Sequence, residues 1–500
     1  MNARYPIALA AALTAASACA TPPASEPAPA PAPVTTTTAA STTPTFDRSQ
    51  QPKLGAPPAV QLPPVVTKTL SNGMRLLIVE HRELPVADFI MVVNSGSEAD
   101  PPSHAGLATM TASMLDEGTT TRNSLQIADQ SAYLGLQLGT GAGWDASRLF
   151  LHTPTRQLDS ALALFADVVL NPSFPQKELD RLKQDRLTSL LQVRDRGPAI
   201  ADRAFSNIVY GADHPYGRST IGTEATTKQI TRADVQRFYR TYYRPNNASV
   251  IVVGNVNPDD IARRFEALFG KWEKAEVPGI AWKQPQAAGT TQIYLIDKPA
   301  APQSSFRIGT VGVPRNTDDF FALLVANTIL GGSFTSRLNN NLRETKGYTY
   351  GAGSVFDMRQ SAGPFVARAE ITGTKSDSAL VEFMKELNSI RDTVPAAELA
   401  KAKRLRQLEL PAGFESTTDI ANRLVPIVLY NLPLAYYNSY VQNIEAVTQA
   451  DVQRVARRYI DPSKLSIVVV GDRASVEPTL KALNMAPVQV RDITGEPLRP

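Results

Sequence analysis

The stretch Ala233-Asp234-Val235-Gln236-Arg237 recurs 217 residues later as Ala450-Asp451-Val452-Gln453-Arg454. The match continues at the same offset, so that twelve of twenty-two positions agree. The further matching positions are Arg240 with Arg457, Tyr242 with Tyr459, Pro245 with Pro462, Ser249 with Ser466, and Val252-Val253-Gly254 with Val469-Val470-Gly471. Repetition at a period this long indicates a duplicated domain.

Each copy ends in the same order of elements. A polar amphipathic helix is followed by a proline-marked turn and by a strand, residues 249–253 or 466–470, that is almost wholly apolar and therefore buried on both faces. Upstream, strands and helices alternate, which favours an α+β fold. The predicted strands are 75–80, 88–94, 292–296 and 305–312, and the predicted helices are 104–116, 124–134, 158–170, 176–195, 318–330, 377–392 and 396–408.

The chain therefore divides into six segments. We expect a signal peptide at 1–19, a disordered linker rich in Pro, Ala and Thr at 20–64, an N-terminal domain at 65–270 and a C-terminal domain at 292–485. A linker at 271–291, marked by prolines and glycines, joins the domains, and 486–500 form a tail. Composition alone leaves open whether residues 20–64 act as a spacer or have no role.

The N-terminus predicts export. One positive charge precedes the apolar run 5–18, which is too short to span a bilayer and is typical of a secretory signal. The small residues Ala16, Ser17 and Ala18 ahead of Cys19 resemble a bacterial lipobox, in which the cysteine is lipidated. We expect a periplasmic protein anchored to the outer membrane through Cys19; cleavage after Ala18 or Ala20, giving a soluble periplasmic protein, is the alternative.

Ligand counting limits the metal chemistry of the chain. It has four histidines, no two of them close in sequence, and one cysteine, so a zinc site of paired histidines is nearly excluded and an intrachain disulfide is impossible. A net charge of +4 over 500 residues gives no electrostatic footprint for nucleic acid.

Several short motifs, in a fixed order over about residues 65–475, resemble the pitrilysin/insulinase family of inverted zincins, to which mitochondrial processing peptidase also belongs. They are Leu70-Ser71-Asn72-Gly73-Met74-Arg75, Gly106-Leu107-Ala108, Glu117-Gly118-Thr119, His214-Pro215-Tyr216-Gly217 with Gly222, and Tyr243-Arg244-Pro245-Asn246-Asn247. The resemblance implies two homologous domains, each a mainly antiparallel sheet covered by helices, and pairing with a second such chain around a closed chamber.

The family's zinc motif is missing. It reads H-x-x-E-H on a helix, where these positions share one face. The flanking motifs place it on Thr109-Met110-Thr111-Ala112-Ser113, so Thr109, Ala112 and Ser113 replace both histidines and the general base. The family's third ligand, a glutamate, falls near Leu190, where residues 188–193 contain no acid and no histidine. The spacing of Leu107, Met110 and Met114 still predicts the helix.

The C-terminal domain keeps a second family feature. The resemblance implies that Arg343 and Tyr350, seven residues apart, reach across the chamber to the substrate backbone, where a guanidinium and a phenol can hold a carbonyl and stabilise an oxyanion. The alternative is that Arg343 caps a helix and Tyr350 packs on a strand. The turn at Gly331 and Gly332 permits close backbone approach, either between the halves or against a ligand.

These features favour a non-catalytic, substrate-binding subunit of a heterodimeric periplasmic zinc metallopeptidase. It supplies Arg343 and Tyr350 to a homologous partner that carries the zinc motif; this chain alone binds no metal and is inactive. The alternative is a catalytically dead homologue that acts as an envelope scaffold or peptide-binding protein. An enzyme with a relocated metal site is disfavoured, because His104 has no suitable partner ligands and is expected to lie in a loop or at a helix start, while His81, His152 and His214 are isolated.

Overall fold

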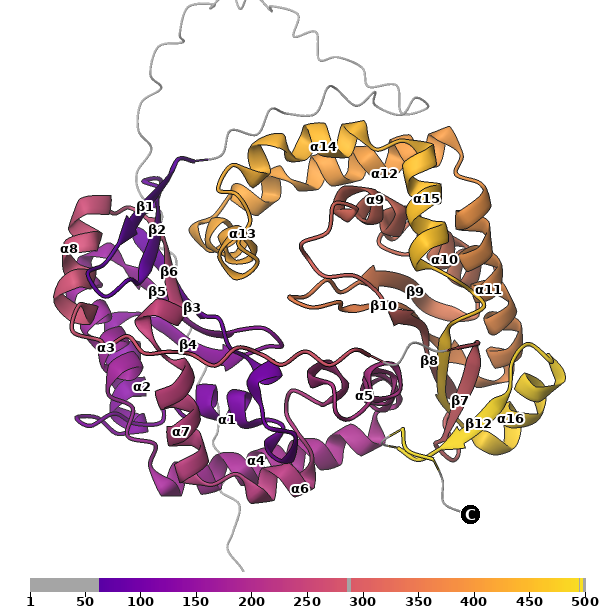
Figure 1. Cartoon of the computed structure of the whole chain (residues 1–500), viewed down its shortest axis with the longest axis horizontal. Coiled ribbons are helices and arrows are strands. Elements are labelled where there is room, and N and C mark those ends of the chain that lie inside the picture. Colours follow the sequence, from indigo (N-terminus) through magenta and orange to yellow (C-terminus); the bar gives the residue numbers. More distant parts are fainter. Residues whose placement is uncertain (1–62, 286–288, 494, 498–500) are drawn as a thin grey trace, which may run out of the picture. The chain divides into compact units, whose positions relative to one another are not determined.

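The computed structural model describes residues 63–285, 289–493 and 495–497. The predicted signal peptide, Cys19 and nearly all of the predicted linker 20–64 lie outside these residues. These described residues belong to one compact unit, which holds two six-stranded sheets. The α+β class and the mainly antiparallel sheets covered by helices are confirmed (Figure 1).

The two sheets repeat one topology. The first has the order β1-β2-β6-β3-β5-β4 and the second β12-β7-β11-β8-β10-β9, so β2-β6-β3-β5-β4 corresponds to β7-β11-β8-β10-β9. Strands β2 and β6 pair in parallel, as do β7 and β11. The strands are β1 Val65–Thr69, β2 Arg75–Glu80, β3 Val86–Val93, β4 Gln137–Ala142, β5 Ser147–Pro154, β6 Ala248–Gly254, β7 Gln292–Asp297, β8 Gln303–Val311, β9 Thr349–Phe356, β10 Pro364–Thr372, β11 Ser466–Gly471 and β12 Val488–Arg491.

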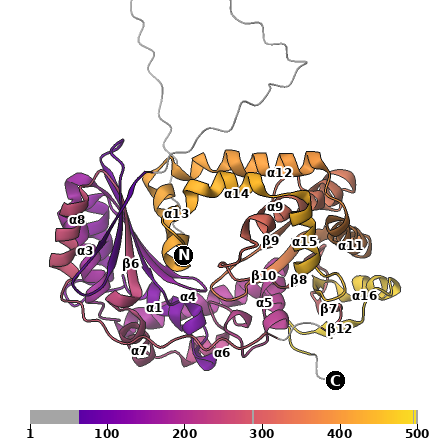
Figure 2. The same cartoon turned by 45° about the horizontal axis from the view of Figure 1, so that its top comes forward.

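Helices cover both sheets (Figures 1 and 2). In the first half they are α1 Leu107–Ser113, α2 Ser124–Leu134, α3 Leu158–Leu170, α4 Gln176–Asp195, α5 Gly197–Tyr210, α6 Glu224–Gln229, α7 Arg232–Tyr242 and α8 Pro258–Phe269. In the second half they are α9 Phe320–Leu330, α10 Arg337–Asn339, α11 Ser376–Asp392, α12 Ala396–Glu409, α13 Thr417–Leu429, α14 Tyr440–Ala446, α15 Gln449–Tyr459 and α16 Arg473–Ala482. None of the described helices is long and apolar enough to cross a membrane.

The sequence repeat coincides with a repeated helix start. At α7 the hydroxyl of Thr231 accepts the backbone N–H of Asp234, and the Asp234 carboxylate accepts the backbone N–H of Thr231. Thr448 and Asp451 form the same reciprocal pair at α15. Such a capping box satisfies donors that a helix start leaves unpaired, so the repeated sequence specifies the repeated helix. The strands that follow, β6 and β11, are buried throughout, as predicted.

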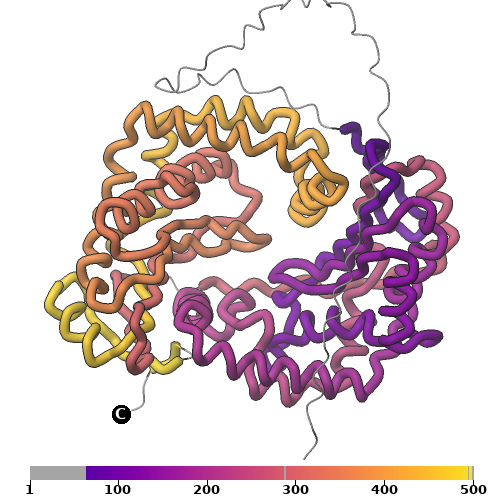
Figure 3. The backbone as a smooth tube through the Cα atoms, turned by 180° about the vertical axis from the view of Figure 1, so that it is seen from behind, coloured from indigo at the N-terminus to yellow at the C-terminus, as the bar shows by residue number. Residues whose placement is uncertain are grey.

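Each half contributes one helix that packs against the sheet of the other half. Helix α5 packs on β8 and β11 of the second sheet, and α13 packs on β3 and β6 of the first. The backbone trace in Figure 3 shows α5 lying beside the second half. Apolar residues make both contacts: Ile200 and Phe205 share a cluster with Val468 and Val470, while Ile420 on α13 shares one with Ile251. Burial of these faces couples the halves into one unit.

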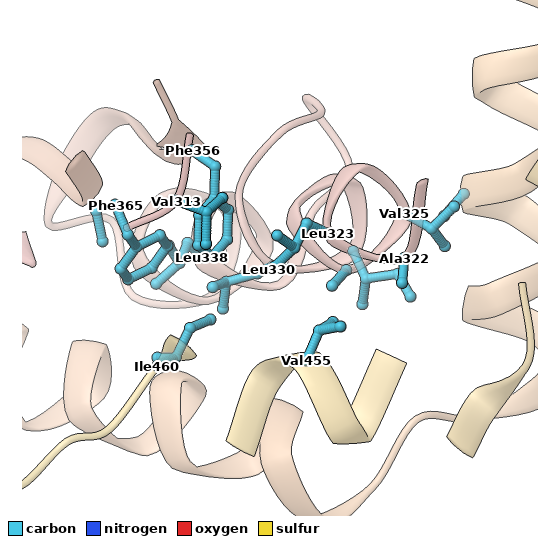
Figure 4. Close-up of a cluster of buried hydrophobic side chains, with 14 of the residues drawn as sticks. Val313, Ala322, Leu323, Val325, Leu330, Leu338, Phe356, Phe365, Val455 and Ile460 are labelled. Carbon is cyan, nitrogen blue, oxygen red and sulfur yellow. The ribbon is translucent and has the colours of Figure 1, made fainter. Parts of the chain in front are cut away.

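A continuous apolar core fills the second half and extends through α13 onto the first sheet. Leu323 and Leu330 on α9 face Val455 on α15 and Ile460 directly after it (Figure 4). Phe356 and Phe365, from β9 and β10, pack with ring centroids 4.6 Å apart and ring planes tilted by 36°, and they extend this core to the edge of the sheet. The edge strand β9 is therefore anchored on one face by buried aromatic rings.

Candidate functional site

Helix α1 carries the emptied motif. Its start is fixed by Asp100, whose carboxylate accepts the backbone N–H groups of Gly106 and Ala108 at 2.7 Å each. Gly106 has φ +92°, so the helix begins at Leu107 rather than at residue 104 as predicted, and it ends at Ser113 rather than at 116. The prediction counted apolar spacing and could not include the conformation of Gly106.

The positions of the missing ligands lie inside the protein. Ala112 is fully buried and Thr109 nearly so, with the Thr109 hydroxyl donating to the carbonyl of Thr220 at 2.9 Å. Ser113 is partly buried on the same helix. The zinc motif requires imidazole and carboxylate groups at these positions. The protein has instead two hydroxyl groups, one of them hydrogen-bonded to a backbone carbonyl, and one methyl group, so these side chains cannot replace the zinc ligands.

A fixed cation lies beside α1. Leu190 is buried on α4, and one turn earlier Arg186 donates to the carbonyl of Gly106 at 2.7 Å. Burial lowers the pKa of Arg186 to about 10, an effect that the nearby Asp100 carboxylate opposes. The contact of α4 with the start of α1 is thus held by a guanidinium. Within the described residues no group of three or more His, Cys, Asp or Glu side chains could hold a metal ion, so the residues present do not fit the family's zinc site.

The four histidines lie apart. His104 is in a short 3-10 turn, with its Nε2 3.6 Å from Asp234 and its Nδ1 2.9 Å from the Ser103 hydroxyl, which confirms a loop histidine. His152 pairs with Asp88 at 3.0 Å. His81 is partly buried with its Nε2 4.0 Å from Glu83, and His214 is buried among Tyr210, Tyr216 and Trp282.

Arg343 and Tyr350 are both accessible. Arg343 lies in a π-helix, Asn340–Thr345, where its Nε is 3.3 Å from Glu344 and its guanidinium lies 4.7 Å from the Phe334 ring centre. Tyr350 is on the edge strand β9 and 89 % exposed. Its ring therefore does not pack against the strand, and the Arg343 side chain is held by an acid and an aromatic ring.

The glycine turn serves the fold of the second half. The Gly331 carbonyl accepts the backbone N–H of Ser354 on β9 at 3.0 Å, and a Cβ on Gly331 would lie 2.2 Å from that nitrogen. A Cβ on Gly332 would lie 2.6 Å from the Asn327 amide nitrogen. The close approach expected at this turn joins α9 to β9, rather than one half to the other.

We expect Gly331→Ala to lower the free energy of unfolding by about 2 kcal/mol or more, because the added methyl group must displace the β9 backbone. Gly351→Ala is the matched control on the same strand, since only one atom, 3.9 Å away, approaches its Cβ position. Urea unfolding of both variants measures the difference. Equal stability of the two variants would contradict the packing described here.

Models of known families match both halves of the chain. Residues 76–224 match the family described as insulinase (peptidase family M16), and residues 229–406 match the peptidase M16 inactive domain. The chain belongs to peptidase family M16. The predicted resemblance is thereby confirmed, and the duplicated sheets are the two M16 domains of one chain.

Similar proteins agree with this assignment. An uncharacterized zinc protease of Mycobacterium tuberculosis is 28 % identical over 425 residues, which cover 84 % of this chain and 96 % of that protein. The crystal structure of a peptidase M16 inactive domain from Pseudomonas fluorescens has a TM-score of 0.76 at 28 % identity, covering 81 % of this chain and 98 % of the other. A protease structure from Helicobacter pylori, 22 % identical with a TM-score of 0.76, covers 82 % and 100 % and shares the M16 fold.

Sequence reasoning missed one part of the site. Strand β4 ends the first sheet next to α1 and pairs only with β5 among the described strands. The sequence did not predict this strand, because its two glycines, Gly139 and Gly141, are of a residue type that is depleted in strands. The only available signal was the apolar alternation of β5, which the turn at 143–146 joins to β4.

Proposed function

We propose that this chain is the non-catalytic, substrate-binding subunit of a heterodimeric periplasmic zinc metallopeptidase. A homologous partner carries the zinc motif and the zinc, and this chain supplies Arg343 and Tyr350 to the peptide held there. The observation that carries the proposal is the contrast within one M16 chain: α1 offers no metal ligand, while Tyr350 is exposed and the Arg343 side chain is partly accessible. Export follows from the N-terminal sequence, and lipid anchoring from Cys19.

The first sheet offers a place for the peptide. Because β4 is an edge strand, one row of its backbone N–H and C=O groups has no strand partner among the described residues. An extended peptide can pair with such an edge, with main-chain hydrogen bonds giving affinity and side-chain pockets giving specificity. The chain thus binds peptide on its first half and contributes donors from its second.

The test is co-purification. A tagged full-length chain, recovered from envelope extract, is expected to bring with it an M16 homologue containing H-x-x-E-H, and metal analysis is expected to find zinc in that complex alone. Recovery without such a homologue would contradict the heterodimer. Stoichiometric zinc in the chain purified by itself would contradict the assignment of the metal to the partner.

A second candidate is a peptide-binding or scaffold protein of the envelope without a peptidase partner. It is favoured by the unpaired edge of β4, which can bind a peptide without contributions from another chain. The neighbouring coding sequence separates the two candidates. An adjacent M16 gene with an intact zinc motif supports the heterodimer, and its absence supports the scaffold.

A further inference from the structure

A hollow of about 440 Å³ opens on the inner face of the first sheet, beside β4. Its floor belongs to β3, β4 and β5, and one wall is formed by α13 from the second half. Unlike the emptied motif on α1, it contains a guanidinium group and an aromatic ring. The residues that matter are Gly139, Gly141, Arg148, Phe150, Thr418 and Asn422.

The strand register explains why the hollow exists. Gly141 lies opposite Arg148, and Gly139 lies opposite Phe150, so all four residues share one face of the sheet. On β4 that face carries no side chain at either position. A Cβ on Gly141 would meet no atom within 4 Å, whereas one on Gly139 would lie 2.8 Å from the Phe150 ring. The two glycines thus leave Arg148 and Phe150 accessible from the free edge of the sheet.

The guanidinium group of Arg148 has no partner among the described residues. Within the described residues it forms no hydrogen bond or ion pair, and the phenol of Tyr430 is the titratable group that acts on its pKa. Partial burial lowers the pKa of Arg148, although the group remains charged at neutral pH because an arginine pKa starts far above 7. An accessible guanidinium that has no anionic partner among the described residues is suited to bind a carboxylate.

One acid, Asp88, lines the hollow; its Oδ1 is engaged, while its Oδ2 has no hydrogen-bond partner among the described residues. Asp88, 2 % exposed, accepts from the Thr418 hydroxyl at 3.2 Å and lies 3.0 Å from His152 Nδ1. Asn422 donates to the carbonyl of Thr418 within α13. These contacts hold the wall in place and leave Arg148 for a ligand.

We propose that this hollow selects peptides with an acidic side chain and, two positions away, an apolar side chain. This inference rests on the proposed function, since it assumes a peptide paired with β4. Peptide residues opposite Gly141 and Gly139 point into the hollow, because side chains two apart share a face. The peptide residue opposite Gly141 is two strand spacings from Arg148, a backbone separation of roughly 10 Å. A Glu and an Arg side chain together span this distance. The peptide residue opposite Gly139 meets Phe150.

The experiment compares two labelled nine-residue peptides of alternating Ala and Thr. One has Glu and Phe two positions apart at its centre, and the other has Gln in place of Glu. Fluorescence anisotropy with the full chain is expected to show about tenfold tighter binding of the Glu peptide, the range of a hydrogen bond to a charged group. Arg148→Gln is expected to abolish the preference, and Arg148→Glu to transfer it to a Lys peptide.

Two further variants make the result specific. Gly141→Leu places a side chain in the hollow at a position where the added Cβ meets no atom within 4 Å, and it is expected to weaken binding of the Glu peptide about tenfold or more. Arg156→Gln, an exposed arginine directly after β5, is the matched control and is expected to leave both affinities unchanged. Equal binding of both peptides overturns the selectivity and leaves the proposed function intact. Binding of neither peptide overturns both.

Discussion

In the complex with its zinc-motif partner, Arg343→Ala is expected to lower kcat for peptide hydrolysis by about 100-fold to 1,000-fold, the usual cost of removing one donor to a developing oxyanion. The guanidinium is accessible, and its contacts within the chain are the Glu344 carboxylate and the Phe334 ring. Because surface changes away from packed contacts shift stability little, the loss should occur without a change in melting temperature. Steady-state hydrolysis of a fluorogenic peptide measures the loss.

Tyr350→Phe tests the phenol alone, since it keeps the ring and removes only the hydroxyl. We expect a similar loss in kcat with a smaller change in KM, because the donor acts mainly on charge that develops during the reaction. Tyr133→Phe is the matched control, because this tyrosine on α2 is 88 % exposed. Hydrolysis that is unchanged in both the Arg343 and the Tyr350 variants would exclude the proposed role, even if the heterodimer itself forms.

The sequence predicted the parts of the fold that depend on local pattern. Helix α4 runs over the predicted residues 176–195, and β6 and β11 are buried as their apolar runs indicated. It did not predict α5 or α13. Each of these helices buries its apolar face against a sheet of the other half, so no local signal shows its partner. Their first residues, Gly197 and Thr417, are 220 positions apart, close to the period of 217, so these helices could have been inferred only by extending the repeat upstream.

The candidate site, too, was predicted from the sequence only in part. The flanking motifs located the positions of the missing zinc ligands on α1 and α4, because their order and spacing fix the alignment with the family. They could not show that Arg186, one turn before Leu190, holds the start of α1, or that Arg343 lies in a π-helix. Spacing along the chain also could not place Arg148 beside Gly141, because this depends on strand pairing.

A buried acid beside α1 gives the largest expected effect on stability. Glu98 is 3 % exposed, and its carboxyl oxygens accept only the backbone N–H of Gly96 among the contacts described. The pKa of Glu98 is raised to about 8, mainly by burial; the nearby Asp145 and Asp100 carboxylates contribute to the rise, and the Gly96 N–H opposes it. The native protein therefore holds a proton here that the unfolded chain releases near pH 4.5.

The contribution of protonated Glu98 to the free energy of unfolding is fully present below pH 4.5. It is lost as the pH rises toward 8, because the unfolded chain then binds fewer protons than the native protein. Asp100, whose pKa burial raises to about 7, changes stability in the same direction. His214 acts oppositely: burial lowers its pKa to about 4, so its contribution is complete above pH 6.5 and is lost as the pH falls toward 4.

Glu98→Gln isolates the Glu98 contribution, since an amide keeps the shape and an acceptor oxygen but cannot ionise. Relative to wild type, we expect the variant to gain about 1.4 kcal/mol in free energy of unfolding for each pH unit between about 5 and 8, or about 4 kcal/mol in total. Urea unfolding of both proteins across this range measures the difference. A difference that does not change with pH would mean that the Glu98 carboxyl ionises normally, and that the loop before α1 admits water to it.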